Sequence, residues 1–243
     1  MDNRIIKAGG VTGAEVTDEM LAKINAYTIK PLAAEEVYVF RIAMCDNEVD
    51  RDEEAFTTGA LGQLAELFRG KTVISDHRWQ AERQVARIFD TEVEAMEGTA
   101  KTGEPAARLV AYCYTLRNET NRDLIAEIDA GIKREVSVGC AVATCECSVC
   151  GVNRRNVWCE HVPGKSYEGA ACFIRLKDAV DAYELSFVAV PAQREAGVIK
   201  SYGAEKPAEA PDPAEEPGEI KAKREALERR QKLNEDYTFA IKI

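Results

Sequence analysis

The chain has 243 residues, of which 46% are hydrophobic and 30% are charged, a composition typical of a globular protein. Its 32 lysines and arginines stand against 42 aspartates and glutamates, and the resulting net charge of −10 argues against nucleic acid as a main partner. No apolar run approaches the roughly 20 residues that a membrane helix needs, and the first residues lack a signal-peptide pattern, so we expect a cytosolic protein without a membrane segment.

The first half of the chain predicts strands separated by single helices. Residues 1–36 are expected to form an N-terminal extension with a short amphipathic helix over 17–27. A β-rich run starts at Val37, and the acidic segment 45–54 ends it. Apolar residues at helical spacing predict a helix over 57–68, with Gly70 directly after its end. Further strands are predicted over 73–75, 86–89 and 109–116.

The second half is richer in strands. A helix is predicted over 121–132, followed by strands over 135–144, 173–176 and 183–190, and Pro191 ends the series. This order favours a mixed α+β domain whose sheet is able to close on itself.

The composition changes after about Tyr202. Residues 203–219 hold four of the eight prolines among acidic residues and predict a stiff, solvated linker. Residues 220–243 predict a charged helix and a tail whose alternating apolar residues suit addition to a sheet edge, with a frayed terminus as the alternative.

Four residues have the spacing of a structural zinc site. Cys147 and Cys150 form a CxxC pair, and Cys159 and His161 form a CxH pair after a short loop. Thiolates and an imidazole suit Zn²⁺, and four protein ligands leave no open position for water, so we expect a structural ion. Cys145 is the candidate to replace a missing thiolate. The alternative is a cysteine-rich loop without metal.

A second group of residues has the types that nucleophilic catalysis needs. The chain has only two histidines, so with His161 in the metal set His77 is the imidazole left for proton transfer. Ser137 lies two residues before Gly139, which permits unusual backbone geometry. Glu184 stands in an apolar run, where a buried carboxylate needs a cation or an imidazole as partner. A surface histidine and an ordinary strand serine are the simpler interpretations, although such residues can form a triad in any chain order.

At these residues the chain resembles the prohead (capsid maturation) serine proteases of tailed bacteriophages, which are related to the herpesvirus assemblin proteases. The resemblance extends over about 37–200, through the segments DNEVDRDEEAF, GKTVISDHRW, QVARIFDTEVE, NRDLIAEIDAGIKREVSVGC and DAYELSFVAVPAQREAGV. It implies a closed or nearly closed β-barrel ringed by helices over 37–202, with the zinc-binding insert at 145–164.

The resemblance also implies the roles and the substrates. Ser137 would be the nucleophile, His77 the general base and Glu184 the third member of the triad. Backbone amides near Ser137 or in 189–197 would stabilise the oxyanion, with Arg194 as a further candidate. The substrates would be scaffolding protein and the scaffold-like segment of the major capsid protein, cut inside the procapsid in the host cytoplasm, with self-cleavage and, by analogy with the herpesvirus relatives, a homodimer.

Three alternatives stay open. The chain is a catalytically inactive, zinc-containing assembly or scaffold protein of the same fold; or a zinc-dependent binding module that uses Arg154 and Arg155; or an enzyme whose nucleophile is Cys140.

Overall fold

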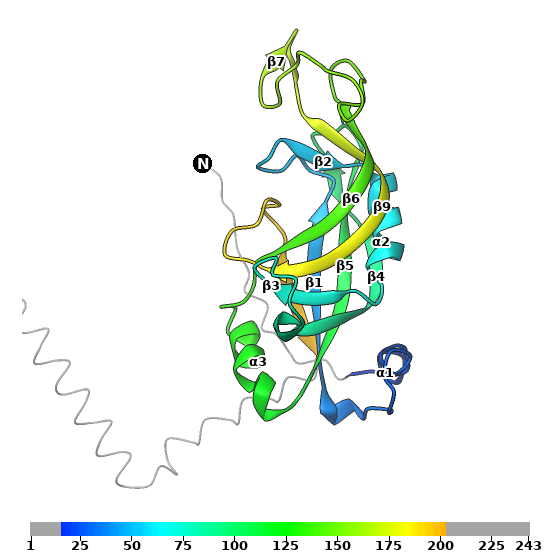
Figure 1. The fold of residues 1–243 in the computed structure, drawn as a ribbon, viewed down its shortest axis with the longest axis vertical. Coiled ribbons are helices and arrows are strands. Elements are labelled where there is room, and N and C mark those ends of the chain that lie inside the picture. Colours follow the sequence, from blue (N-terminus) through cyan, green and yellow to red (C-terminus); the bar gives the residue numbers. More distant parts are fainter. Residues whose placement is uncertain (1–15, 203–243) are drawn as a thin grey trace, which may run out of the picture. The chain divides into compact units, whose positions relative to one another are not determined.

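A computed structural model describes residues 16–202 of the chain (Figure 1). The α-helices of this part are α1 (Asp18–Asn25), α2 (Thr58–Phe68) and α3 (Arg122–Asp129), and short 3₁₀ helices lie at Ala34–Glu36, Ala81–Arg83 and Glu119–Asn121. The strands are β1 (Val37–Asp46), β2 (Glu54–Phe56), β3 (Thr72–Ser75), β4 (Ala86–Thr99), β5 (Pro105–Leu116), β6 (Val136–Cys147), β7 (Ser166–Tyr167), β8 (Ala170–Ala171), β9 (Ile174–Phe187) and β10 (Gly197–Tyr202). The predicted linker at 203–219 and the predicted helix and tail at 220–243 lie outside the described residues.

The three α-helices predicted within the described residues are confirmed to within a few residues at each end. Threonine side chains begin two of them, because Thr17 accepts from the backbone of Met20 and Thr57 accepts from that of Ala60. Gly70, with φ +79°, follows the end of α2 as expected. None of these helices is long and apolar enough to cross a membrane.

The strands differ more from the prediction. The two strands expected at 173–176 and 183–190 are one continuous strand, β9, because the segment between them, 177–182, also pairs with β6. Strand β4 runs ten residues beyond the predicted 86–89, paired with β5. Strands β2 and β10 were not predicted.

One mixed sheet carries the fold. Its order is β10-β1-β5-β4-β3-β9-β2, and β6 pairs with β9. Strands β2 and β3 lie parallel to β9 at its two ends, and the other ladders of this sheet are antiparallel. Strand β9 is therefore flanked by β6 along one edge and by β3 and β2 along the other.

The expected closed barrel is wrong for this structure, since the described sheet does not close. A single bridge joins Glu135, just before β6, to Gly197 at the start of β10. Beyond it, β6 and β1 do not pair, and a cavity lined by Met44 of β1 and by Val138 and Val142 of β6 lies between them.

Two apolar clusters hold the sheet and its helices. The main core joins β1 to one face of α2, whose residues Leu61, Leu64 and Phe68 are fully buried. A separate cluster holds α1, because Ile24 packs with Val37 and with Phe89. The N-terminal helix is thus attached to the sheet outside the main core.

Candidate functional site

His77 lies in a turn with an uncommon backbone. It follows β3, and the turn closes with Arg78 N donating to the Ser75 carbonyl at 3.2 Å. Asp76 and His77 have φ of +57° and +53°, values that residues other than glycine seldom adopt. The turn is fixed to β9, because His77 N donates to Ser186 Oγ at 3.0 Å. A strained backbone held this firmly marks a candidate functional position.

His77 and Glu184 are in direct contact, although 107 positions separate them. His77 Nδ1 lies 2.8 Å from Glu184 Oε1, and Ser186 Oγ donates to Glu184 Oε2 at 2.6 Å. The glutamate side chain is 3% exposed and that of the histidine is 45% exposed. The partner that Glu184 was expected to need is therefore His77, and a proton on Nδ1 toward the carboxylate leaves Nε2 as the basic nitrogen.

Gly139 makes room for this carboxylate. It pairs with Glu184 across the β6–β9 ladder, and a Cβ atom at position 139 would lie 2.4 Å from Glu184 Oε1. Its φ is not in the left-handed region, although the register of the β6–β9 ladder shifts between Gly139 and Cys140. The glycine is required for space.

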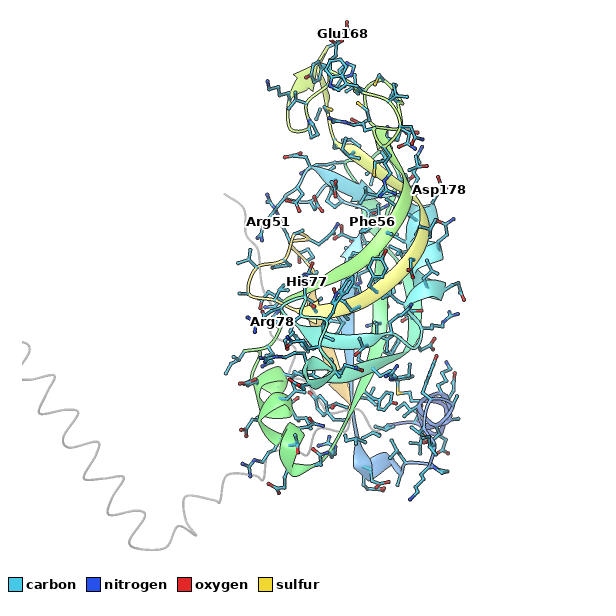
Figure 2. All side chains as sticks on the ribbon, viewed as in Figure 1. Arg51, Phe56, His77, Arg78, Glu168 and Asp178 are labelled. Carbon is cyan, nitrogen blue, oxygen red and sulfur yellow. The ribbon has the colours of Figure 1, made fainter. Side chains whose placement is uncertain are left out.

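Ser137 lies on the same face of the sheet as the histidine–glutamate pair. It pairs with Ser186, two residues from the pair formed by Gly139 and Glu184, and residues two apart on a strand share a face. No hydrogen bond joins Ser137 to His77 in the described part of the chain. Strands β6, β9 and the β3 turn bring the three predicted residues to one region. Figure 2 labels His77 in this region.

A bulge in β9 adds an aromatic wall beside this region. Gly139 pairs with Glu184 and Cys140 with Ala182, so Tyr183 has no partner in the β6–β9 ladder. Its ring lies 5.4 Å from that of the exposed Trp79. Both aromatic residues and Glu184 line a cavity of about 280 Å³. Trp79 was not predicted as a site residue, although it stands two residues after the histidine.

A second cavity, of about 530 Å³, contains Ser137 and shares Tyr183 with the first. Cys140 also lines it. Burial, followed by the charges of Glu54 and Glu184, raises the pKa of Cys140 to about 11. A thiol that stays protonated at neutral pH is a poor nucleophile, which argues against the Cys140 alternative. Arg194, the suggested oxyanion helper, is exposed.

The four predicted metal ligands form a cluster. The candidate ligand atoms of Cys147, Cys150, Cys159 and His161 all lie within 4.8 Å of one another, and Cys150 Sγ is 3.4 Å from Cys159 Sγ. Tetrahedral zinc with Zn–S bonds of about 2.3 Å places its sulfur ligands about 3.8 Å apart, so the donor set and its spacing fit such an ion. The cluster can hold a metal.

A fourth cysteine lies beside this cluster, and it is not the expected one. Cys172 Sγ is 4.0 Å from Cys147 Sγ and is fully buried. Cys145, the expected substitute ligand, instead lines the cavity that contains Ser137. Cys145 stands two residues before Cys147 on β6, and residues at this separation along a strand are about 7 Å apart. Cys145 therefore does not belong to the cluster. Sequence spacing did not reveal Cys172, because 13 positions separate it from Cys159.

Cys147 is the thiol best prepared for a metal. Burial opposes its ionisation, yet hydrogen bonds from the backbones of Cys150 and Val149 and from neighbouring thiols lower the pKa of Cys147 to about 6. A thiolate at neutral pH is the form that binds a metal.

The cysteine cluster lies at the far end of the β6–β9 ribbon from His77. Strand β6 ends at Cys147, Cys172 stands two residues before β9 begins, and the insert with β7 lies away from β3 (Figure 1). Strand β6 thus includes the first three residues of the insert expected at 145–164. A metal here would hold together the ends of the two strands that carry Ser137 and Glu184.

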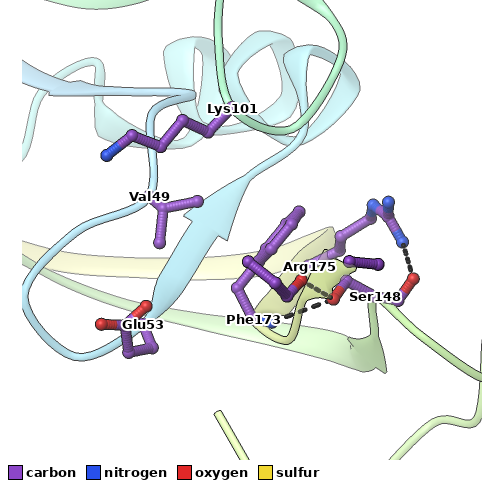
Figure 3. A pocket seen from close by; sticks show the side chains of 8 residues that line it. Val49, Glu53, Lys101, Ser148, Phe173 and Arg175 are labelled. Atoms are coloured by element: carbon purple, nitrogen blue, oxygen red, sulfur yellow. Dashed lines mark hydrogen bonds between the residues drawn. The ribbon is translucent and has the colours of Figure 1, made fainter. Parts of the chain in front are cut away.

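A third cavity, of about 550 Å³, lies between the segment before β2 and the insert, and includes none of the predicted catalytic or metal-binding residues (Figure 3). Its polar contacts are structural: Ser148 Oγ accepts from Phe173 N at 2.9 Å, and Arg175 donates to the Ser148 carbonyl at 3.3 Å.

Comparison of the chain with protein-family models, with curated proteins and with solved structures finds no match. The fold and the two clusters of side chains are therefore the basis for a functional assignment.

Proposed function

We propose that the chain is a serine endopeptidase of phage capsid maturation, with Ser137 as nucleophile, His77 as general base and Glu184 as the residue that orients the imidazole. The observation that carries the proposal is the 2.8 Å contact between His77 Nδ1 and a buried Glu184, on the sheet face that also carries Ser137. A carboxylate, an imidazole and a hydroxyl in this order are the groups of a hydrolytic triad.

The chemistry follows from the order of the groups. Ser137 Oγ attacks the carbonyl carbon of the scissile peptide bond while its proton passes to His77 Nε2. The imidazolium then gives this proton to the leaving amine, and the carbon–nitrogen bond breaks. Water, deprotonated by the same nitrogen, releases the acyl group from Ser137. Glu184 holds the proton on Nδ1 and stabilises the positive charge on the ring.

A zinc ion bound by Cys147, Cys150, Cys159 and His161 is part of the proposal, in a structural role. The four donors complete a tetrahedral set, so no position is left for a reacting water. The chemistry that the ion supplies when bound is the cross-linking of the insert.

The substrates proposed from the resemblance are scaffolding protein and the scaffold-like segment of the major capsid protein, cut inside the procapsid in the host cytoplasm. A homodimer is part of the same analogy. Incubation of the purified chain with its capsid subunit, followed by mass spectrometry of the new termini, tests the substrate assignment. Cuts that persist with a Ser137→Ala chain would contradict it.

A fluorophosphonate probe tests the enzyme assignment directly. We expect the probe to label Ser137 of the folded chain, and the label to be absent from Ser137→Ala and His77→Ala. The control is Ser201→Ala, which removes another strand serine and should label normally. Equal labelling of wild type and Ser137→Ala would overturn the assignment.

The alternative of an inactive assembly protein with the same fold starts from one observation. Ser137 and His77 share no hydrogen bond within the described residues. Catalytic hydrogen bonds are often long in free enzymes and shorten when substrate binds, so this geometry suits either reading. A folded chain that no fluorophosphonate labels, and that still enters procapsids, would support the inactive protein.

A further inference from the structure

The cavity that contains Ser137 has two unlike walls. Met44, Phe56 and Leu176 supply apolar surface, whereas Asp50, Asp52 and Glu54 supply three carboxyl groups from the segment that enters β2. An apolar wall next to negative charge suits a long side chain with an alkyl stem and a cationic end.

The carboxyl groups have little positive charge to balance them. None of the three forms an ion pair with a lysine or arginine in the described part of the chain. Arg155 lines the same cavity and donates to the Val142 carbonyl, so one positive charge stands against three carboxyl groups in the lining. Burial, and then repulsion by Asp50 and Asp52, raises the pKa of Glu54. A cation placed among them would relieve this repulsion.

A buried amide group also lacks a partner in this cavity. Gln193, 7% exposed, accepts from Asp46 N through Oε1 at 3.2 Å, which identifies its other terminal atom as nitrogen. This Nε2 has no hydrogen-bond partner among the described residues. A buried donor left without an acceptor costs about 1–3 kcal/mol, and a peptide carbonyl is an acceptor that a substrate would bring.

The acidic wall lies close to the catalytic candidates. The charges of both Glu54 and Glu184 act on Cys140, which is three residues from Ser137 on β6. Tyr183 lines this cavity and also the one that contains Glu184. A substrate peptide whose scissile bond lies at Ser137 can therefore place a neighbouring side chain in the acidic cavity.

We propose that this cavity is the substrate subsite for a lysine or arginine side chain near the scissile bond, a proposal that rests on the peptidase function. The alkyl stem contacts Met44, Phe56 and Leu176, and the cationic end lies at Asp50 and Glu54. Gln193 Nε2 donates to a backbone carbonyl of the same substrate.

Peptide binding to the Ser137→Ala chain tests the subsite without turnover. The probes are two fluorescein-labelled peptide mixtures that differ only at one fixed position, which is lysine in one and the uncharged norleucine in the other. We expect the lysine mixture to bind about ten-fold more tightly in fluorescence polarisation, because only it brings a charge to the carboxylates. Adding Asp50→Asn and Glu54→Gln should abolish the preference.

Asp50→Asn is a mild change, because its remaining Oδ1 still accepts from the backbones of Asp52 and Glu54. The matched control is Glu53→Gln, which removes a charge from the same segment. Glu53 lines the cavity of about 550 Å³ and not the one that contains Ser137, so this variant should keep the full preference. If circular dichroism shows that the chain with both substitutions is unfolded, each substitution is tested alone. Each should then reduce the lysine preference in part.

Equal binding of the two mixtures, binding of neither, or a lysine preference that survives in the variants would overturn the subsite. Fluorophosphonate labelling of Ser137 is measured separately on the wild-type chain. Loss of labelling thus counts against the peptidase, whereas loss of the lysine preference counts against the subsite alone.

Discussion

At the scale of single residues, the candidate site depends on small groups that place larger ones. Ser186 contacts both partners of the pair, because its hydroxyl accepts from His77 N and donates to Glu184 Oε2. Both oxygens of the buried carboxylate are thus hydrogen bonded, as a buried charge requires. The imidazole is left with one nitrogen free to exchange a proton.

Replacing Glu184 by glutamine tests the charge without changing the shape. We expect fluorophosphonate labelling of Ser137 to slow about 10³- to 10⁴-fold, because the amide no longer stabilises the imidazolium or the useful tautomer. The measurement is the second-order labelling rate. The control is Glu82→Gln in the exposed 3₁₀ helix, which should label at the wild-type rate. A Glu184→Gln rate within ten-fold of wild type would remove Glu184 from the triad.

Gly139→Ala tests the space that the carboxylate needs. The added Cβ would lie 2.4 Å from Glu184 Oε1, so we expect the carboxylate to move from His77, with a loss of about 1–3 kcal/mol in unfolding free energy and a slower labelling rate. The control is Gly62→Ala in α2, where nothing lies within 4 Å, and which should be neutral or stabilise by up to about 1 kcal/mol. Urea unfolding and the labelling rate decide the result.

At the scale of elements, the β6–β9 ribbon connects the two functional clusters. One end carries Ser137 and Glu184, and the other end carries Cys147 and leads into Cys172. The insert between these strands has a small core of its own, built around buried cysteines. A bound ion would therefore supply much of its stability.

Metal removal tests this arrangement. We expect mass spectrometry to find one zinc ion per chain. A chelator should lower the melting temperature, by about 2–4 °C for each kcal/mol of unfolding free energy that is lost with the ion. Labelling of Ser137 should slow but persist, because the ion acts through the strands. Labelling abolished by the chelator while the melting temperature stays unchanged would contradict a structural role.

Cysteine variants identify the ligands. Cys147→Ser should lose the metal, whereas Cys145→Ser should retain it, because Cys145 lies outside the cluster. Cys172→Ser is informative in its own right, since retention of one zinc ion would show that the four predicted donors suffice.

At the scale of the whole molecule, the sheet is open and carries a second apolar cluster on the side of α1. Ile24 is fully buried there, against Val37, Val39 and Phe89. This attaches part of the N-terminal extension to the domain through a contact separate from the main core.

Ile24→Ala should cost about 2–5 kcal/mol in the free energy of unfolding, because it leaves a cavity in this cluster. Ile29→Ala is the matched control, since Ile29 is 102% exposed and the same substitution should change stability by less than about 0.5 kcal/mol. Urea unfolding measures both. Equal stability of the two variants would show that α1 contributes nothing to the fold.

Self-cleavage is the prediction for the C-terminal linker, which lies outside the described residues. Trimming near residues 203–220 should depend on Ser137, and intact mass spectrometry of wild-type and Ser137→Ala chains measures it. Equal trimming of both would assign the cut to another protease.

The features that could be predicted from the amino-acid sequence are those that depend on short spacings along the chain. Helices α1 and α2 follow from apolar periodicity. The four metal ligands follow from a CxxC and a CxH pair, because donors a few residues apart are close in any compact loop. The sequence also singled out Glu184, because a carboxylate in an apolar run needs a partner.

Contacts between residues far apart in the chain could not be predicted in this way. The contact between His77 and Glu184, the space at Gly139 and the bulge at Tyr183 depend on the register of β9 with β3 and β6. That register is set by packing across the whole sheet, which local pattern does not encode. The same packing left the barrel open, brought Cys172 to the metal cluster, and buried Gln193 with an unpaired amide beside the acidic cavity.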